Sequence, residues 1–210
     1  MHTAMRATSL TLKKLLEDGF DADSELAPLF HAGGGTMIVS LDNPQEFEDD
    51  GGQGLSLWLY RLMRDDQRLN APPERVTPTQ LRPTPLPLRL HFMLTPVVVG
   101  ANTLATHAAE QEQTILGKAM QVLYEHPMLR GTDLEDDFRG TDSVVSVRLE
   151  ALTLDEVSRV WHALGRPYRL SASYEVSIAY IAPTVQPMQV TPVRVAMPEL
   201  EQILEVTGVT

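Results

Sequence analysis

Residues 152–181 read LTLDEVSRVWHALGRPYRLSASYEVSIAYI, and this stretch carries the strongest local signals of secondary structure in the chain. Thr153 and Glu156 have the spacing of a capping box, in which the hydroxyl accepts from a first-turn amide and the carboxylate reaches back. A helix is therefore predicted from residue 154, ended by Gly165 and Pro167. Its predicted buried stripe consists of Leu154, Val157, Trp161 and Leu164.

The second half of the stretch predicts a strand. Apolar and polar side chains alternate from Leu170 to Tyr180, as expected when one face of a strand is buried. Trp161, Tyr174 and Tyr180 are expected to lie in the core rather than to contact a partner. Working outward, the same alternation predicts strands at residues 145–151 and 86–95. Three-and-four spacing of apolar residues predicts a long helix over 105–126, ended by Pro127.

A further strand, 55–64, is apolar on both faces. Strict alternation places Leu55, Leu57 and Leu59 on one face and Trp58, Tyr60 and Leu62 on the other. Such a strand is either central in its sheet or covered by a partner. Core packing explains most of the pattern, and the second face leaves room for a partner. The candidate partner contacts on this strand are Trp58, Tyr60 and Arg64.

The remaining segments are less regular. A short helix is predicted over 9–18, capped by Thr8 or Ser9, and a short strand over 37–41. Residues 42–54 and 133–142 are predicted acidic loops, and the proline-rich stretch 70–87 an extended connection. Proline also punctuates residues 182–210, where Val190–Ala196 is a possible edge strand. The candidate partner contacts in this tail are Val190, Val193 and Val195.

This order of elements predicts the fold class. Strands and helices mix without strict βαβ alternation, so we expect an α/β protein of the α+β type. It should be a single domain with a mixed, mostly antiparallel sheet flanked by helices. The predicted division is a core domain over 1–181 and a proline-punctuated C-terminal arm over 182–210.

Composition excludes several classes of protein. The formal net charge is −11, from 28 acidic and 17 basic residues, which disfavours nucleic-acid binding. The chain has no cysteine, so disulfides, thiolate metal sites and a cysteine nucleophile are excluded, and a cytoplasmic location is expected. No apolar run is long enough to predict membrane insertion.

No motif for catalysis, cofactor binding or metal binding emerges. The six histidines share no ligand spacing, and no nucleophile elbow or phosphate-binding loop is present. Alternating acids at Asp21–Glu25 and Asp133–Asp137 are followed by Leu26 and Phe138 where a calcium loop needs glycine. We therefore predict no catalytic residue, no cofactor and no metal, and a protein that is not an enzyme.

Four segments together resemble a known family. They are GLSLWLYRLMRDDQRLNAPP (54–73), PLPLRLHFMLTP (85–96), ILGKAMQVLYEHPMLRG (115–131) and the stretch 152–181. Their order and spacing are similar to the N-terminal-domain family of tail-terminator, or cap, proteins of extracellular contractile injection systems, which are phage-tail-like particles. The chain departs from the family pattern at residues 33–54, which are rich in Gly and Asp, and in the tail 182–210.

The resemblance implies a structural role. Such proteins are thought to form a hexameric ring that ends the inner tube and anchors the last layer of the sheath. The implied partners are further copies of the chain, the inner-tube protein and the sheath protein.

Two alternatives stay open at the level of sequence. The acidic loops also suit a soluble adaptor that loads cargo or anchors another component of the particle. An enzyme without a recognisable motif would have His91 and the acidic loop 133–142 as its best candidates, although nothing in the sequence places them together.

Overall fold

The computed structural model describes residues 3–30, 34–66, 72–82, 86–98, 105–181 and 188–190. The chain divides into two compact units. One is formed by Met1–Ala71 with Pro85–Pro183, and the other by Pro72–Thr84 with Thr184–Thr210. The split between a core over 1–181 and an arm over 182–210 stays a prediction.

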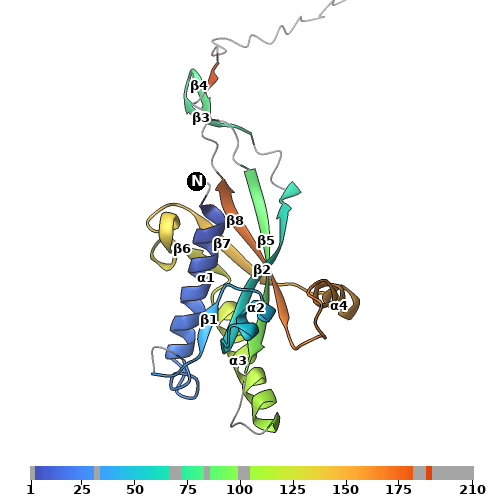
Figure 1. Cartoon of the computed structure of the whole chain (residues 1–210). Coiled ribbons are helices and arrows are strands. Elements are labelled where there is room, and N and C mark those ends of the chain that lie inside the picture. Colours follow the sequence, from blue (N-terminus) through green and yellow to red (C-terminus); the bar gives the residue numbers. More distant parts are fainter. Residues whose placement is uncertain are drawn as a thin grey trace, which may run out of the picture. The chain divides into compact units, whose positions relative to one another are not determined.

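The larger unit is built on one six-stranded sheet with the order β1-β2-β5-β8-β7-β6. Its strands are β1 (Ile38–Ser40), β2 (Gly54–Arg64), β5 (Leu86–Val97), β6 (Met128–Arg130), β7 (Val144–Leu149) and β8 (Ala172–Ile181). β1 and β2 pair in parallel, and the other neighbours pair antiparallel. With the helices α1 (Ala4–Asp21), α2 (Pro44–Asp49), α3 (Ala105–Glu125) and α4 (Leu154–Ala163), this confirms the predicted fold class (Figure 1).

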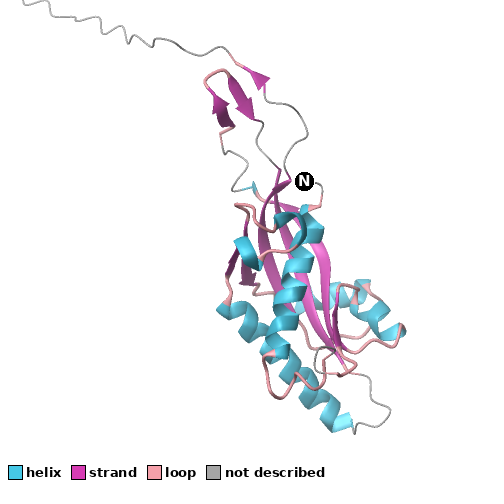
Figure 2. Cartoon of the chain, turned by 90° about the vertical axis from the view of Figure 1, so that its left-hand side faces the viewer, coloured by secondary structure: helices cyan, strands magenta, loops and turns pink. Residues whose placement is uncertain are grey.

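Helices α1 and α3 pack together and cover one face of the sheet (Figures 1 and 2). Leu12, Leu16 and Phe20 of α1 are fully buried there. Gly19 permits a close approach of the two helices, because a Cβ atom at this position would lie 2.4 Å from Cγ2 of Val122. The helix is longer than predicted, so Thr8 and Ser9 do not cap it. Their hydroxyls instead donate to backbone carbonyls four residues earlier.

A β-bulge changes the predicted faces of β2. Leu57 lies opposite Leu94 and Leu59 opposite Phe92, but the register then shifts, so that Leu62 lies opposite Leu90. The extra residue is Tyr60. Because one added residue moves the following side chains to the other face, Leu62 joins the face of Leu57 rather than that of Trp58. Strict alternation was therefore wrong beyond the bulge.

Four other local predictions need correction. Residues 42–54 contain α2, because the Asn43 side chain accepts from the amides of Gln45 and Glu46 and caps it. Residues 70–87 contain a hairpin of β3 (Glu74–Thr77) and β4 (Gln80–Arg82) rather than a plain connection. β6 was not predicted. The loop 133–142 contains a turn of 3-10 helix that buries Phe138.

The smaller unit has a three-stranded sheet with the order β3-β4-β9. β9 (Met188–Gln189) lies just before the predicted edge strand Val190–Ala196. Val190 donates its amide hydrogen to the carbonyl of Thr79 at 2.8 Å. Residues 191–196, including Val193 and Val195, lie outside the described residues, so the edge strand stays a prediction there.

Candidate assembly surfaces

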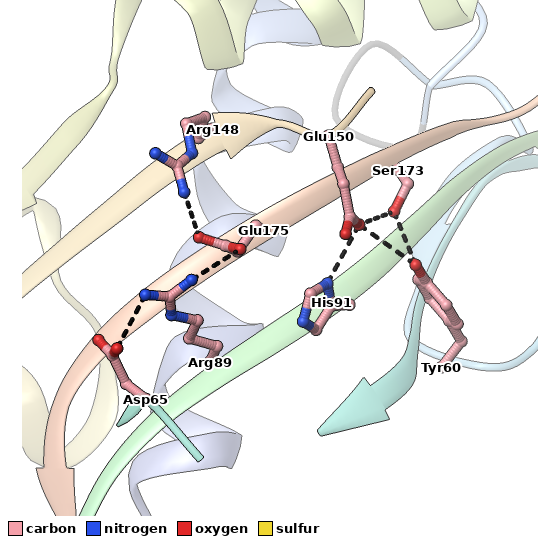
Figure 3. A network of polar contacts seen from close by, with 8 residues as sticks. All are labelled: Tyr60, Asp65, Arg89, His91, Arg148, Glu150, Ser173 and Glu175. Atoms are coloured by element: carbon pink, nitrogen blue, oxygen red, sulfur yellow. Dashed lines mark hydrogen bonds and ion pairs between the residues drawn. The ribbon is translucent and has the colours of Figure 1, made fainter. Parts of the chain in front are cut away.

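The face of the sheet opposite α1 carries a chain of charged side chains across four strands (Figure 3). Asp65, just past β2, binds Arg89 of β5 at 2.8 Å. Arg89 also reaches Glu175 of β8 at 3.4 Å, and Glu175 binds Arg148 of β7 at 2.6 Å. Asp65 is 3% exposed, so the row begins inside the protein. Alternating signs let neighbouring strands pair without leaving a buried charge uncompensated.

A second polar cluster lies beside this row (Figure 3). Glu150, directly after β7, accepts from Ser173 at 2.8 Å and lies 3.1 Å from Nδ1 of His91. Tyr60 is 2.9 Å from the Ser173 hydroxyl and 3.3 Å from the same carboxylate oxygen. Burial by itself would raise the pKa of Glu150, but the contacts with His91, Ser173 and Tyr60 together bring it below its usual value. The pKa of Tyr60 is raised, mainly by burial.

Members of both clusters border one small cavity. A cavity of about 230 Å³ is lined by Met63, Arg64, Asp66, Arg89, His91 and Glu175. Within the described part of the chain, only Nε of Arg89 and Nε2 of His91 among these lining groups are buried without a hydrogen-bond partner. Among the charges that line the cavity, Arg89 binds Glu175 across two strands, and Arg64 binds Asp66 two residues along the chain.

The two elements of the enzyme hypothesis are not brought together. His91 contacts Glu150, whereas the loop 133–142 packs on α1. There Asp136 binds Arg6 at 2.7 Å, and the amide of Glu135 donates to Thr11 at 3.0 Å. Over the described ranges, no group of three or more His, Asp or Glu side chains is placed to hold a metal ion.

The candidate contacts on β2 fall into two groups. Trp58 and Tyr60 are half-buried, with ring centroids 6.0 Å apart, and Tyr60 belongs to the polar cluster. Arg64 is exposed at the end of the strand and pairs with Asp66 at 3.0 Å. Leu62 and Met63 beside it are 49% and 40% exposed. The end of β2 therefore offers exposed apolar and basic side chains, with Leu62 and Met63 on opposite faces of the strand.

Helix α4 forms a second open surface. The capping box at Thr153 and Glu156 is confirmed, but the predicted buried stripe is only partly right, because Val157 and Leu164 are half-buried. Only Trp161 is buried in this helix, and Leu154 is 69% exposed. The reason is that α4 is held by its C-terminal end: the indole N–H of Trp161 donates to Ser171, and the segment after it carries Arg166 and Arg169, which bind acidic residues of α2.

A third surface was missed by sequence reasoning. A groove of about 680 Å³ runs between α3 and β7, and is lined by Gly117, Met120, Gln121, Leu123, Tyr124, Pro127, Val147, Arg148, Leu149 and Tyr174. Tyr124 is 85% exposed and Leu149 51%. Tyr124 falls outside the apolar stripe of its helix, which is the one signal that could have indicated a further surface. The groove joins residues far apart in sequence.

In the described part of the chain, no helix is both long and apolar enough to cross a membrane.

The fold is shared with capping proteins of contractile particles. A sheath/tube terminator of an extracellular contractile injection system, PVC, in its extended state, superposes with a TM-score of 0.59 and 15% identity, over 97% of this chain and 65% of that one. The tube-terminating cap of the anti-feeding prophage superposes with a TM-score of 0.56 and 15% identity, over 88% of this chain and 58% of that one. The chain therefore spans less than two thirds of either structure.

The family model described as the Pvc16 N-terminal domain matches residues 7–195, and the chain belongs to this family. No curated protein shows significant similarity to the sequence.

Proposed function

We propose that the protein is a terminator that ends the inner tube and the sheath of a contractile injection system. The observation that carries the proposal is the family match, which runs over residues 7–195 and so includes segments of both compact units. The fold shared with a sheath/tube terminator and a tube-terminating cap supports it. The role is structural, and the protein is assembled in the cytoplasm as a particle component.

The proposed partners are the tube protein, the sheath protein and further copies of this chain in a six-membered ring. A closed ring needs two different surfaces that fit each other head to tail, and further surfaces for the tube and the sheath. The end of β2, the exposed side of α4 and the groove between α3 and β7 are three separate surfaces with exposed large apolar side chains. Three separate apolar surfaces on one chain support the proposal that it contacts several neighbours in a particle.

Particle assembly with and without the chain tests the proposal. Tube and sheath proteins are produced together with the baseplate, and the particles are measured by electron microscopy. With the chain present, tubes and sheaths should end together at a density that an antibody or tag on the chain labels. Unlabelled ends and unchanged particle lengths would refute the role. Recovery of the chain with another particle component, without tube or sheath, would favour an adaptor instead.

A charge reversal tests the candidate contacts on β2. Arg64→Glu should reduce incorporation into particles, because it places a carboxylate beside the exposed Leu62 and Met63. Arg139→Glu is a matched control, since Arg139 is likewise an exposed arginine that pairs with a nearby acid, Glu135 at 4.0 Å, and lies on none of the three surfaces. Equal loss with both variants would mean that net charge, rather than the end of β2, matters.

A further inference from the structure

The groove between α3 and β7 lies beside an open strand edge. The amide of Glu150 donates to Ser173 of β8 at 2.8 Å, and that of Val147 donates away from β8, to Pro127 at 2.9 Å. Successive residues of a strand direct their backbone groups to opposite edges. Leu149 therefore directs its N–H and C=O away from β8, as Val147 does.

β6 does not cover this position. Its pairing with β7 spans Met128 opposite Ser146 to Arg130 opposite Val144. Among the described residues, no backbone group pairs with the N–H of Leu149. An unpaired edge next to an apolar groove is a template for an added strand, with backbone bonds at the edge and side chains in the groove.

We propose that this edge and groove bind residues 193–197 of a second copy of the chain as an added antiparallel strand. The inference deepens the proposed ring by naming the contact between its copies. The occupant follows from the chain itself: Val190 is the last residue of the described β9 region, at the edge of its small sheet, and the twenty residues 191–210 continue from it.

Charge favours this pair of surfaces. Each copy carries a net charge of −11, so copies repel except where both surfaces lack acidic groups. The groove lining contains no Asp or Glu, and its one charged residue, Arg148, is neutralised by Glu175 at 2.6 Å. The segment 190–198, VTPVRVAMP, also contains no acidic residue. Its valines are typical of strands.

The position of Pro192 fixes which residues face the edge. Proline has no N–H, so Pro192 and Pro198, which flank the proposed strand, fit beside the ladder only where their nitrogens face away from it. Odd-numbered residues must then pair with β7, and directly opposite residues in an antiparallel ladder share a face. Val193, Val195 and Met197 therefore enter the groove beside Leu149, and Arg194 and Ala196 face away from it.

The absence of native cysteine permits a direct test by disulfide trapping. A full-length Leu149→Cys chain is mixed with a tagged full-length chain carrying one cysteine at a position from 193 to 197. Because each chain has a single thiol, any mixed disulfide joins two copies. A disulfide needs Cα atoms roughly 4.4–6.8 Å apart with converging Cβ atoms. The odd-numbered position directly opposite Leu149, which is one of V193C, V195C and M197C, should give a yield at least about fivefold higher than R194C and A196C.

Control reactions separate this contact from random collision. Leu154→Cys places a thiol on α4 at a position that is more exposed than Leu149, and should still give the low yield of the even positions. Equal yields at odd and even positions, or yields no higher than with L154C, would overturn the inference. The reactions are run at a concentration at which sedimentation detects association and again in particles, and an absence of self-association in both would also overturn it.

The outcome of the disulfide experiment and the outcome of the test of the proposed terminator role can be told apart. A ring that forms and enters particles without the odd-numbered pattern would leave the proposed function in place and remove this contact. The odd-numbered pattern in copies that never join tube or sheath would keep the contact and remove the function. As a second measurement, Leu149→Glu should weaken self-association by about tenfold or more, whereas Leu154→Glu should not.

Discussion

Helices α1 and α4 are both amphipathic, but the protein covers only one of them. α1 is 18 residues long and buries eight side chains against the sheet and α3. α4 is 10 residues long and buries one, Trp161. Figure 1 shows the two helices on opposite sides of the sheet. Apolar periodicity identifies which face of a helix is suited to burial, but it does not show whether that face is buried by the same chain or by a partner.

The two faces of the sheet also differ in the interactions that hold them. The side of α1 is held by apolar burial, with Leu90, Phe92 and Val176 fully buried. The opposite side is held by ion pairs and hydrogen bonds among Asp65, Arg89, Glu175 and the cluster around Glu150. We therefore expect substitutions on the first side to act on folding, and substitutions on α4 to act on association.

The largest effect is expected at the buried helix. Leu16→Ala should lower the free energy of unfolding by about 3 kcal/mol, because it opens a cavity where the side chain is 0% exposed. Denaturant unfolding followed by circular dichroism measures the change. The matched control is Leu154→Ala, the same substitution at an exposed leucine of α4. If both variants lose the same free energy of unfolding, α1 and α4 do not differ in their contribution to folding.

A smaller loss of stability is expected from a substitution on the face of the sheet opposite α1. Glu150→Gln should lower the free energy of unfolding by about 2 kcal/mol near neutral pH, since His91, Ser173 and Tyr60 lose a charged partner. The pKa of Glu150 is lowered in the folded protein. The stability it contributes is therefore complete above its unfolded pKa, near 4.5, and is lost as the pH falls through the folded pKa.

Unfolding curves from pH 7 to pH 3 test this sign. The difference between the parent and the Gln variant should be constant at the neutral end and should shrink below about pH 4.5. A difference that instead grows with acidity would mean that the carboxylate is not the acceptor at the centre of this cluster.

The third effect separates the formation of α4 from its burial. Thr153→Ala removes the hydroxyl that accepts from the amide of Glu156, and should cost about 1 kcal/mol in the stability of this helix. Hydrogen exchange should accelerate in α4 and remain unchanged in α1, because α4 has few buried contacts to hold it. Uniform acceleration across both helices would show that α4 unfolds only with the whole domain.

Much of the fold could be predicted because its signals are local. Alternation placed the strands around Leu57, Val147 and Val176, and the box at Thr153 placed the start of α4. The bulge at Tyr60 could not be predicted in this way, since it depends on how β2 pairs with β5. The hairpin of β3 and β4 pairs locally, and it was missed because the density of prolines in this segment favoured an extended connection.

The surfaces were harder to predict than the elements. Trp58, Tyr60 and Arg64 were chosen from a two-faced strand, and two of them prove to be partly covered by their own chain. The groove beside Leu149 could not be found from sequence, because its lining residues come from α3, β7 and β8. Apolar residues at the right spacing look alike whether they are covered within the chain or left open.

The smallest effect on folding is the one that most sharpens the contrast between α1 and α4. Leu154→Ser should change the free energy of unfolding by less than about 0.5 kcal/mol, since the side chain is 69% exposed. If α4 is covered by another component of the particle, the same variant should nevertheless enter particles poorly, as measured by the fraction of labelled ends. A variant that folds and assembles like the parent would show that this exposed leucine belongs to an ordinary solvated surface, and would leave the end of β2 and the groove as the surfaces that carry assembly.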